Sequence, residues 1–285
     1  MDSWQIGDVK ITRIVEIETP TRGDFLFPQA SKESIKREAD WLFPTFTDET
    51  GKLKMSIHAL VIESEGKRIL VDTCIGNDKL RSNPAWNQLK LPFLKNLARA
   101  GDSRESIDRV VCTHLHVDHV GWNTMLAAGK WVPTFPNARY VIGGIEWDFW
   151  SKHEDPDTRV LVDDSVRPVV AAGMTDLVES THRITGEVWL EPSPGHTPGH
   201  HSVRISSKGR EAVITGDLMH HPIQCAHPEW DDKFDSDGAQ AKQTRRAFCE
   251  RYADRDVLVL GTHFATPSCG KIVSQGASFR FIAAS

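Results

Sequence analysis

The sequence predicts an α/β sandwich in which two β-rich halves are interleaved with helices. Short apolar segments of strand length occur in both halves of the chain, helical segments separate several of them, and no internal repeat is present. The 285 residues are enough to build one large core, and no Pro/Gly/Ser-rich linker divides them. We therefore expect residues 1–285 to form a single domain.

The first 73 residues contain three predicted strands. Apolar and polar residues alternate over residues 9–17, as in a half-buried strand. Two further strands, at residues 56–64 and 67–73, are separated by the hairpin signal Glu65-Gly66. Between the first and second strands the alternation stops, and residues 19–54 are rich in aromatics and prolines. We expect this N-terminal excursion to cover either an active site or a partner surface.

The rest of the chain alternates between helical and strand patterns. Helices are predicted at residues 92–101, where Gly101 provides the C-terminal signal, from residue 146 to 150, at 163–178 and at 244–253. Strands are predicted at residues 107–113, 138–144, 187–192, 200–206, 211–217 and 256–263.

Charge and composition exclude several classes of protein. The net charge is −5 with a pI of about 6.2, and no basic stripe is present, so neither nucleic acid nor an anionic membrane surface is an expected partner. No run of about eighteen apolar residues exists to span a membrane. The N-terminus lacks the pattern of a signal peptide. The five scattered cysteines predict reduced thiols, and Cys112 lies in an apolar segment that predicts a core position. We expect a cytoplasmic protein.

Four side chains that commonly bind metals lie within six residues. They are His114, His116, Asp118 and His119, directly after the predicted strand at 107–113. A regular strand would point alternate side chains to opposite faces, so the four converge only if they occupy a loop at the end of that strand. Imidazole nitrogens suit zinc, and a nearby carboxylate offers an oxygen to a second ion. This hexad predicts a metal site.

Three further candidate ligands follow apolar strands elsewhere in the sequence. His196 follows the strand at 187–192, while Asp217 and His263 end the strands at 211–217 and 256–263. A strand that ends on a ligand places that ligand at one edge of a sheet, and several such edges can share a cleft. The four elements together predict one shared metal centre.

These motifs resemble those of the metallo-β-lactamase superfamily. THLHVDH, at residues 113–119, is similar to the signature loop of that family, and the resemblance extends from ILVDTCIG through GHTPGHHS and TGD to GTHF. It implies an αββα sandwich of two mixed sheets flanked by helices, with a dinuclear site at the edge between the sheets. It also implies that Asp72 orders the ligand loop by hydrogen bonding. A histidine at 116, where the diiron flavoprotein branch has glutamate, favours a hydrolytic zinc site.

The resemblance further implies how two Zn²⁺ ions, or other divalent metals, would be shared. The ligands would be His114, His116 and His196 for one ion, Asp118, His119 and His263 for the other, and Asp217 together with a hydroxide between them. The hydroxide would attack a lactone or carboxylic ester. Asp118 or Asp217 would accept or return the proton.

Two residues outside the ligand set are candidates for substrate binding. Acyl-homoserine lactonases usually have a tyrosine near the position of His220, and a histidine there resembles the methyl parathion hydrolase branch. His220 is expected either to donate a hydrogen bond to a substrate oxygen or to orient a ligand. Trp122 follows the hexad at once and is expected to form part of the substrate pocket.

Several alternatives remain open at this point. A phosphotriester hydrolase, a thioesterase of the glyoxalase II type and a metal-dependent binding module would each use the same ligands. The thioesterase is disfavoured because the chain ends about twenty residues after His263, without a C-terminal helical domain. An exported β-lactamase and the nuclease branches are disfavoured as well. The aromatic excursion would bury itself either against a second subunit, giving a homodimer, or against its own domain.

Overall fold

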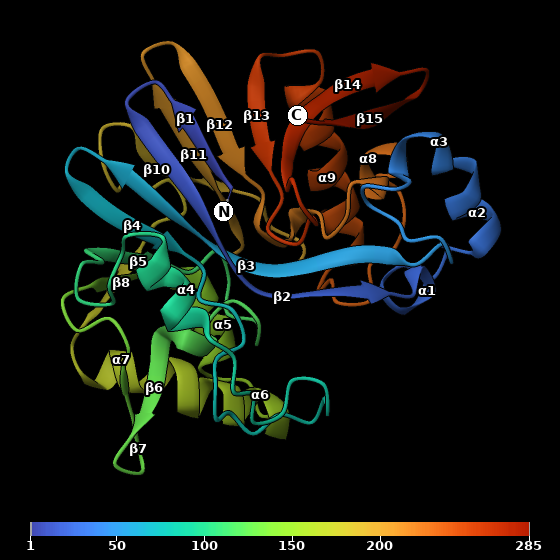
Figure 1. Cartoon of the computed structure of the whole chain (residues 1–285). Coiled ribbons are helices and arrows are strands. Elements are labelled where there is room, and N and C mark those ends of the chain that lie inside the picture. Colours follow the sequence, from blue (N-terminus) through green and yellow to red (C-terminus); the bar gives the residue numbers. More distant parts are fainter. Residues whose placement is uncertain (1, 285) are drawn as a thin grey trace.

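The computed structural model describes residues 2–284, and two mixed β-sheets form its centre (Figure 1). The first sheet has the spatial order β1 (Ser3–Ile6), β2 (Val9–Thr21), β3 (Leu53–Ser64), β4 (Lys67–Val71), β5 (Arg109–Val111), β8 (Arg139–Gly143) and β9 (Thr175–Val178). The second sheet has the order β10 (Val188–Pro192), β11 (His201–Ser207), β12 (Arg210–Ile214), β13 (Val257–Leu260), β14 (Cys269–Gln275) and β15 (Ser278–Ala283). A separate hairpin consists of β6 (Thr124–Ala127) and β7 (Lys130–Pro133).

Helices flank both sheets. The α-helices are α1 (Gly23–Leu26), α2 (Lys32–Arg37), α3 (Ala39–Leu42), α4 (Phe93–Arg99), α5 (Gly144–Trp150), α6 (Pro156–Leu161), α7 (Arg167–Ala171), α8 (Ile223–Ala226) and α9 (Gly238–Tyr252). A π-helical turn, η2 (Val162–Val166), joins α6 to α7, and 3₁₀ turns occur at η1 (Gly121–Asn123) and η3 (Gly216–Leu218).

Three apolar cores account for the layers. One lies between the sheets and combines side chains of β1 to β5 with side chains of β10 to β13. A second lies on the outer face of the first sheet, under α4, α6 and α7. A third lies on the outer face of the second sheet, under α8 and α9. The predicted αββα arrangement is therefore confirmed.

Strand β3 is apolar on both faces because both faces are buried. Leu60 and Ile62 point into the core between the sheets, while Ala59 and Val61 point into the outer core. A strand that is covered on both faces cannot alternate between apolar and polar residues. The predicted hairpin to β4 is confirmed: Glu65 and Gly66 both have positive φ, at 50° and 73°, as a type I′ turn requires.

The helix predicted over residues 163–178 is correct only in its first part. The chain is helical through η2 and α7, and Gly173, with a φ of 68°, then reverses it. Residues Thr175–Val178 form the edge strand β9 beside β8. Pairing with an existing sheet edge outweighs the helical periodicity of so short a segment.

The excursion at residues 19–54 contains the end of β2 and helices α1 to α3, which lie at the far end of the long β2–β3 ribbon (Figure 1). Most of its aromatic side chains belong to the core under α8 and α9. Phe46, for example, contacts Phe264 and Phe281 edge to face, with ring centroids 6.5 and 5.8 Å apart. Phe25 is instead exposed.

The five cysteines are buried and unbridged, and Cys112 occupies the outer core of the first sheet, as predicted. Within residues 2–284, no helix combines the length and apolar character needed to cross a membrane.

Candidate metal centre

The predicted ligands come from loops that follow strands of both sheets. The histidine-rich loop follows β5 of the first sheet, while Asp217 and His263 follow β12 and β13 of the second. A backbone hydrogen bond of 3.1 Å from His201 to the carbonyl of Thr113 ties the histidine loop to the second sheet. The carboxyl ends of strands from both sheets therefore meet at one place.

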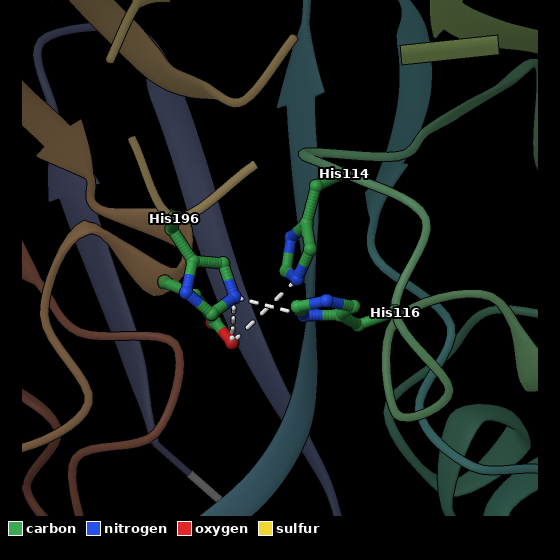
Figure 2. Close-up of side chains that lie close together, drawn as sticks. His114, His116 and His196 are labelled. Atoms are coloured by element: carbon green, nitrogen blue, oxygen red, sulfur yellow. Dashed lines mark hydrogen bonds and ion pairs between the residues drawn. The ribbon is translucent and has the colours of Figure 1, made fainter. Parts of the chain in front are cut away.

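The first ligand group consists of three histidines that face Asp217. Figure 2 shows the rings of His114, His116 and His196 pointing toward one another. His196 Nε2 lies 2.8 Å from His116 Nδ1. The Nε2 atoms of His114 and His196 lie 3.6 and 3.5 Å from Asp217 Oδ2. One atom from each of the four residues falls within 4.8 Å of the others, which is close enough to surround one ion.

The second ligand group consists of Asp118, His119 and His263. The Nε2 atoms of the two histidines lie 3.2 Å apart and are 3.7 and 3.6 Å from the Asp118 carboxylate. Asp217 also faces this group, with Oδ2 at 3.1 Å from His119 Nε2 and Oδ1 at 3.2 Å from His263 Nε2. Asp217 thus lies between the two groups, in the position predicted for a bridging ligand.

Four of the histidines turn Nε2 toward this centre and Nδ1 toward a protein oxygen. In each ring, Nδ1 faces a protein oxygen at 2.9–3.1 Å, and this contact favours the tautomer with its proton on Nδ1. These pairs are His114 with Thr113 Oγ1, His119 with Asp72 Oδ2, His196 with Asp235 Oδ1 and His263 with the Ser56 carbonyl. With Nδ1 protonated, the lone pair lies on Nε2, which is the form of histidine that binds a metal.

The buried atoms at the centre lack partners that a metal would supply. Among residues 2–284, His114 Nε2 and Asp217 Oδ1 are buried and accept no hydrogen bond. Leaving such atoms unpaired is unfavourable inside a protein. Nitrogen lone pairs together with two carboxylates fit divalent ions such as zinc.

Asp72 orders the histidine loop, as the resemblance implies. Its Oδ1 accepts a hydrogen bond of 2.8 Å from the Thr113 backbone, and its Oδ2 faces His119 Nδ1 at 2.9 Å. Its backbone has a φ of 59°, in the left-handed region that aspartate tolerates better than most residues.

Two aspartates that the sequence did not single out lie directly behind the centre. Asp235 Oδ1 accepts from His196 Nδ1 at 3.0 Å, and Asp232 Oδ2 lies 2.7 Å from His220 Nδ1. Both belong to the loop between α8 and α9.

The fully buried Arg245 on α9 holds this loop by donating to Asp235 and to the carbonyls of Pro228 and Trp230. Burial raises the pKa of Asp235 to about 6. The pattern DDKFD carries no known metal spacing, so only the fold reveals these contacts.

His220 lies beside the bridging aspartate. Its Nε2 is 3.1 Å from Asp217 Oδ2, and its ring stacks on that of His263 with centroids 5.3 Å apart. Burial alone would lower the pKa of His220, but Asp232 and Asp217 raise it well above its usual range. The geometry is compatible with both predicted roles. It also places His220 in a third group of ligand atoms with Asp217 and His263.

A cavity of about 770 Å³ opens onto the metal centre. His116, Asp118, Asp217, His220 and His263 line its polar part. The residues that line its apolar part come from several separate segments and include Phe25, Leu26, Leu80, Trp86, Trp150, Val160, Leu161 and Phe234. A mainly apolar pocket with a few polar groups at one end is typical of a small-molecule site.

The family assignment follows from a comparison with known families. A model of the metallo-beta-lactamase superfamily matches residues 54–263, which include all seven predicted ligands. The chain belongs to this superfamily.

Relatives within the superfamily include lactonases. An N-acyl homoserine lactonase from Bacillus sp is 24% identical over 174 residues, which are 57% of this chain and 63% of that protein. Among solved structures, the dizinc quorum-quenching lactonase AidC in complex with a product has a TM-score of 0.82 at 22% identity, covering 100% of this chain and 97% of that one. The hydrolase AbOPH has a TM-score of 0.81 at 24% identity, with the same coverage. These structures share the fold of this chain.

The structure brings the seven predicted ligands of this metallo-β-lactamase fold together, with His220 beside them. It places Trp122 elsewhere. Trp122 is buried, stacks on Phe93 with centroids 5.7 Å apart and does not line the cavity. Trp150, in the aromatic segment 146–150, lines the cavity instead, with its ring 5.1 Å from that of His116. The prediction that Trp122 lines the substrate pocket is wrong, because η1 turns its side chain into the core although it lies close to the hexad in sequence.

Proposed function

We propose that this protein is a hydrolase that uses two metal ions, zinc in the first instance, to open lactones or to cleave carboxylic esters. The observation that carries the proposal is the convergence of seven candidate ligands at the polar end of an apolar cavity, four of them histidines whose Nδ1 atoms face protein oxygens. The similarity to an N-acyl homoserine lactonase supports the lactone arm.

In this proposal the metals are held by the predicted sets. One ion would take His114, His116 and His196, the other would take Asp118, His119 and His263, and Asp217 would serve both. When bound, two zinc ions supply Lewis acidity and an activated water at neutral pH.

The remaining steps belong to residues of the chain. Asp118 lines the cavity and is more exposed than Asp217, at 13% against 2% of the side chain, so it is better placed to accept and return a proton. His220 directs Nε2 toward Asp217 and the cavity, where it would donate to a substrate oxygen. The apolar wall would hold the hydrocarbon part of the substrate and exclude water from it.

The test is a substrate panel assayed with metal-depleted and zinc-reconstituted protein. The panel contains lactones with short and long acyl side chains, aryl esters, thioesters and phosphotriesters. We expect zinc-dependent hydrolysis of the lactones or carboxylic esters, with chelation abolishing it and added zinc restoring it. Greater kcat/KM for a phosphotriester or a thioester would contradict the proposed substrate class. Two bound ions without hydrolysis of any member would identify a metal-dependent binding module instead.

A further inference from the structure

Glu146 is a buried carboxylate that joins two ligand loops far apart in the sequence. It lies in the first turn of α5 and its side chain is fully buried. Oε1 accepts a hydrogen bond of 3.1 Å from the backbone N–H of Leu115, which lies between His114 and His116. Oε2 accepts one of 2.9 Å from the backbone N–H of Gly199, three residues after His196. One side chain therefore fixes the distance between the loops that carry the first ligand group.

Two further contacts strengthen this connection. Oε1 also accepts a hydrogen bond of 2.5 Å from Trp150 Nε1, and the Trp150 ring lies against His116. The backbones approach so closely that a Cβ atom at Gly199 would lie 2.4 Å from the Glu146 backbone nitrogen. Glycine at 199 is therefore required for the loop to approach α5.

The donors around Glu146 require a carboxylate. Three N–H groups point at its two oxygens, so both oxygens act as acceptors. An amide in the same place would direct an NH₂ group at one or more of these donors. A buried donor without an acceptor is unfavourable, so a glutamine here would push the two loops apart.

A second glutamate has the same kind of contacts with the loop after β4. Glu16, at a bulge in β2, accepts from the backbone N–H groups of Ile75 and Gly76 at 2.8 and 3.3 Å and from Trp122 Nε1 at 2.7 Å. The loop that it holds continues from Asp72, which contacts His119. Each ligand group is thus supported by its own glutamate and tryptophan.

We propose that Glu146 is a positioning residue that sets the metal affinity of the His114, His116 and His196 group separately from that of the second group. The proposal rests on the metal assignment of the proposed function. Within residues 2–284, Glu146 makes no hydrogen bond or ion pair with a candidate ligand side chain. It acts through the backbone of the two loops and through the Trp150 ring, and contacts of this indirect kind change metal affinity by about 10- to 100-fold.

The test measures zinc affinity by chelator competition, starting from metal-free protein. The variants are Glu146→Gln and the matched control Asp148→Asn, which removes an exposed carboxylate of the same helix. His196→Ala and His263→Ala identify which binding step belongs to which ligand group. We expect Glu146→Gln to weaken the step lost in His196→Ala by about 10- to 100-fold, leaving the other step unchanged. Activity should return at raised zinc concentration, and Asp148→Asn should match the unmodified protein.

Melting temperatures of the metal-free proteins separate positioning from a general role in folding. Equal weakening of both steps, together with a lower melting temperature of metal-free Glu146→Gln, would overturn the proposal, as would unchanged affinities.

If Glu146→Gln does not fold, Trp150→Phe removes one donor to Glu146 and should weaken the same step by a smaller factor. No change in either step would then overturn the proposal. Fewer than two zinc ions in the unmodified protein would contradict the metal assignment itself.

Discussion

Asp217 is the residue through which the two ligand groups are connected, because its carboxylate lies within 3.1–3.6 Å of histidines from both. Asparagine has nearly the same shape but one acceptor oxygen, so it cannot serve two ions in this way. We expect Asp217→Asn to lower kcat by more than about 100-fold and to reduce the zinc content to one ion or none. Metal analysis and steady-state kinetics on the same preparation check this. Full activity with a single zinc ion would contradict the two-metal model.

His220 has a carboxylate next to both of its ring nitrogens, Asp217 at Nε2 and Asp232 at Nδ1. If it donates to a substrate oxygen, His220→Gln should lower kcat by about 100-fold or more, the usual effect of losing one such donor, while zinc content stays at two. Asp232→Asn should lower kcat less, because the imidazole remains. A fall in zinc content in His220→Gln would instead assign His220 to the ligands, through its group with Asp217 and His263.

At the scale of elements, the cavity depends on segments that the sequence does not connect. Phe25 comes from α1, Leu80 from the loop after β4, Val160 from α6 and Phe234 from the loop before α9. All four are large apolar side chains that remain exposed at the cavity. Burying these exposed apolar side chains against the hydrocarbon part of a ligand would be favourable.

Phe25 tests this role of the excursion. Phe25→Ala should raise KM for a lactone with a long acyl chain by about tenfold, equivalent to the loss of roughly 1.4 kcal/mol of apolar contact. A lactone with a short chain, which does not reach α1, should show little change. Leu126→Ala is a matched control, because Leu126 is also exposed but lies on β6 away from the cavity lining. Equal effects on both substrates would contradict the proposed contact.

A buried ion-pair network holds the loop after β4 against η2. Lys79 Nζ donates to the Asp164 carbonyl at 3.0 Å and lies 3.7 Å from the centre of the Trp131 ring, while Arg81 donates to both Asp164 carboxylate oxygens. Burial lowers the pKa of Lys79 from 10.5 to about 7. Between these two values the unfolded chain binds a proton that folded Lys79 has lost, so stability rises with pH across this window.

Lys79→Met removes this pH dependence. From pH 7 to pH 9 the free energy of unfolding of the unmodified protein should increase relative to the variant by about 2 kcal/mol. Urea denaturation of both proteins at the two pH values measures the difference. A constant difference between the two proteins would show that Lys79 keeps its ordinary pKa in the folded state.

The convergence of the seven proposed ligands could be predicted because each belongs to a motif that follows an apolar strand. The groups behind them could not. Asp232, Asp235 and Glu146 act on histidines that lie 12 to 39 positions away or through the backbone of distant loops, and no local spacing marks them. The sequence predicts a helix where strand β9 lies for a similar reason, because its partner β8 belongs to another part of the sequence. Contacts between distant segments decide these features.

At the scale of the whole molecule, the metal centre joins the two sheets. The first sheet supplies the histidine loop after β5, and the second supplies the ligands after β12 and β13. Bound ions would therefore add connections between layers that also share an apolar core and hydrogen bonds, such as that from Ser64 Oγ to Glu187 Oε2.

Removing the metals should lower stability. An ion present at about 1,000 times its Kd adds roughly 4 kcal/mol per site to the folded state. We expect the chelated protein to melt at a lower temperature, and hydrogen exchange to increase first in the loops after β5, β12 and β13. Re-addition of zinc should reverse both effects. An unchanged melting temperature after verified metal removal would show that the sheets are held together without the ions.

The loop between α8 and α9 has a further consequence for how this protein can vary. Asp232 and Asp235 are three residues apart and hold His220 and His196 respectively, while Arg245 anchors the loop from behind. A single inserted or deleted residue between the two aspartates would break at least one of these contacts. Most connections between helices tolerate changes in length, but the length of this one sets the spacing of the carboxylates that contact the two histidines. We therefore expect insertions and deletions to be tolerated less well in this loop than in other loops between helices.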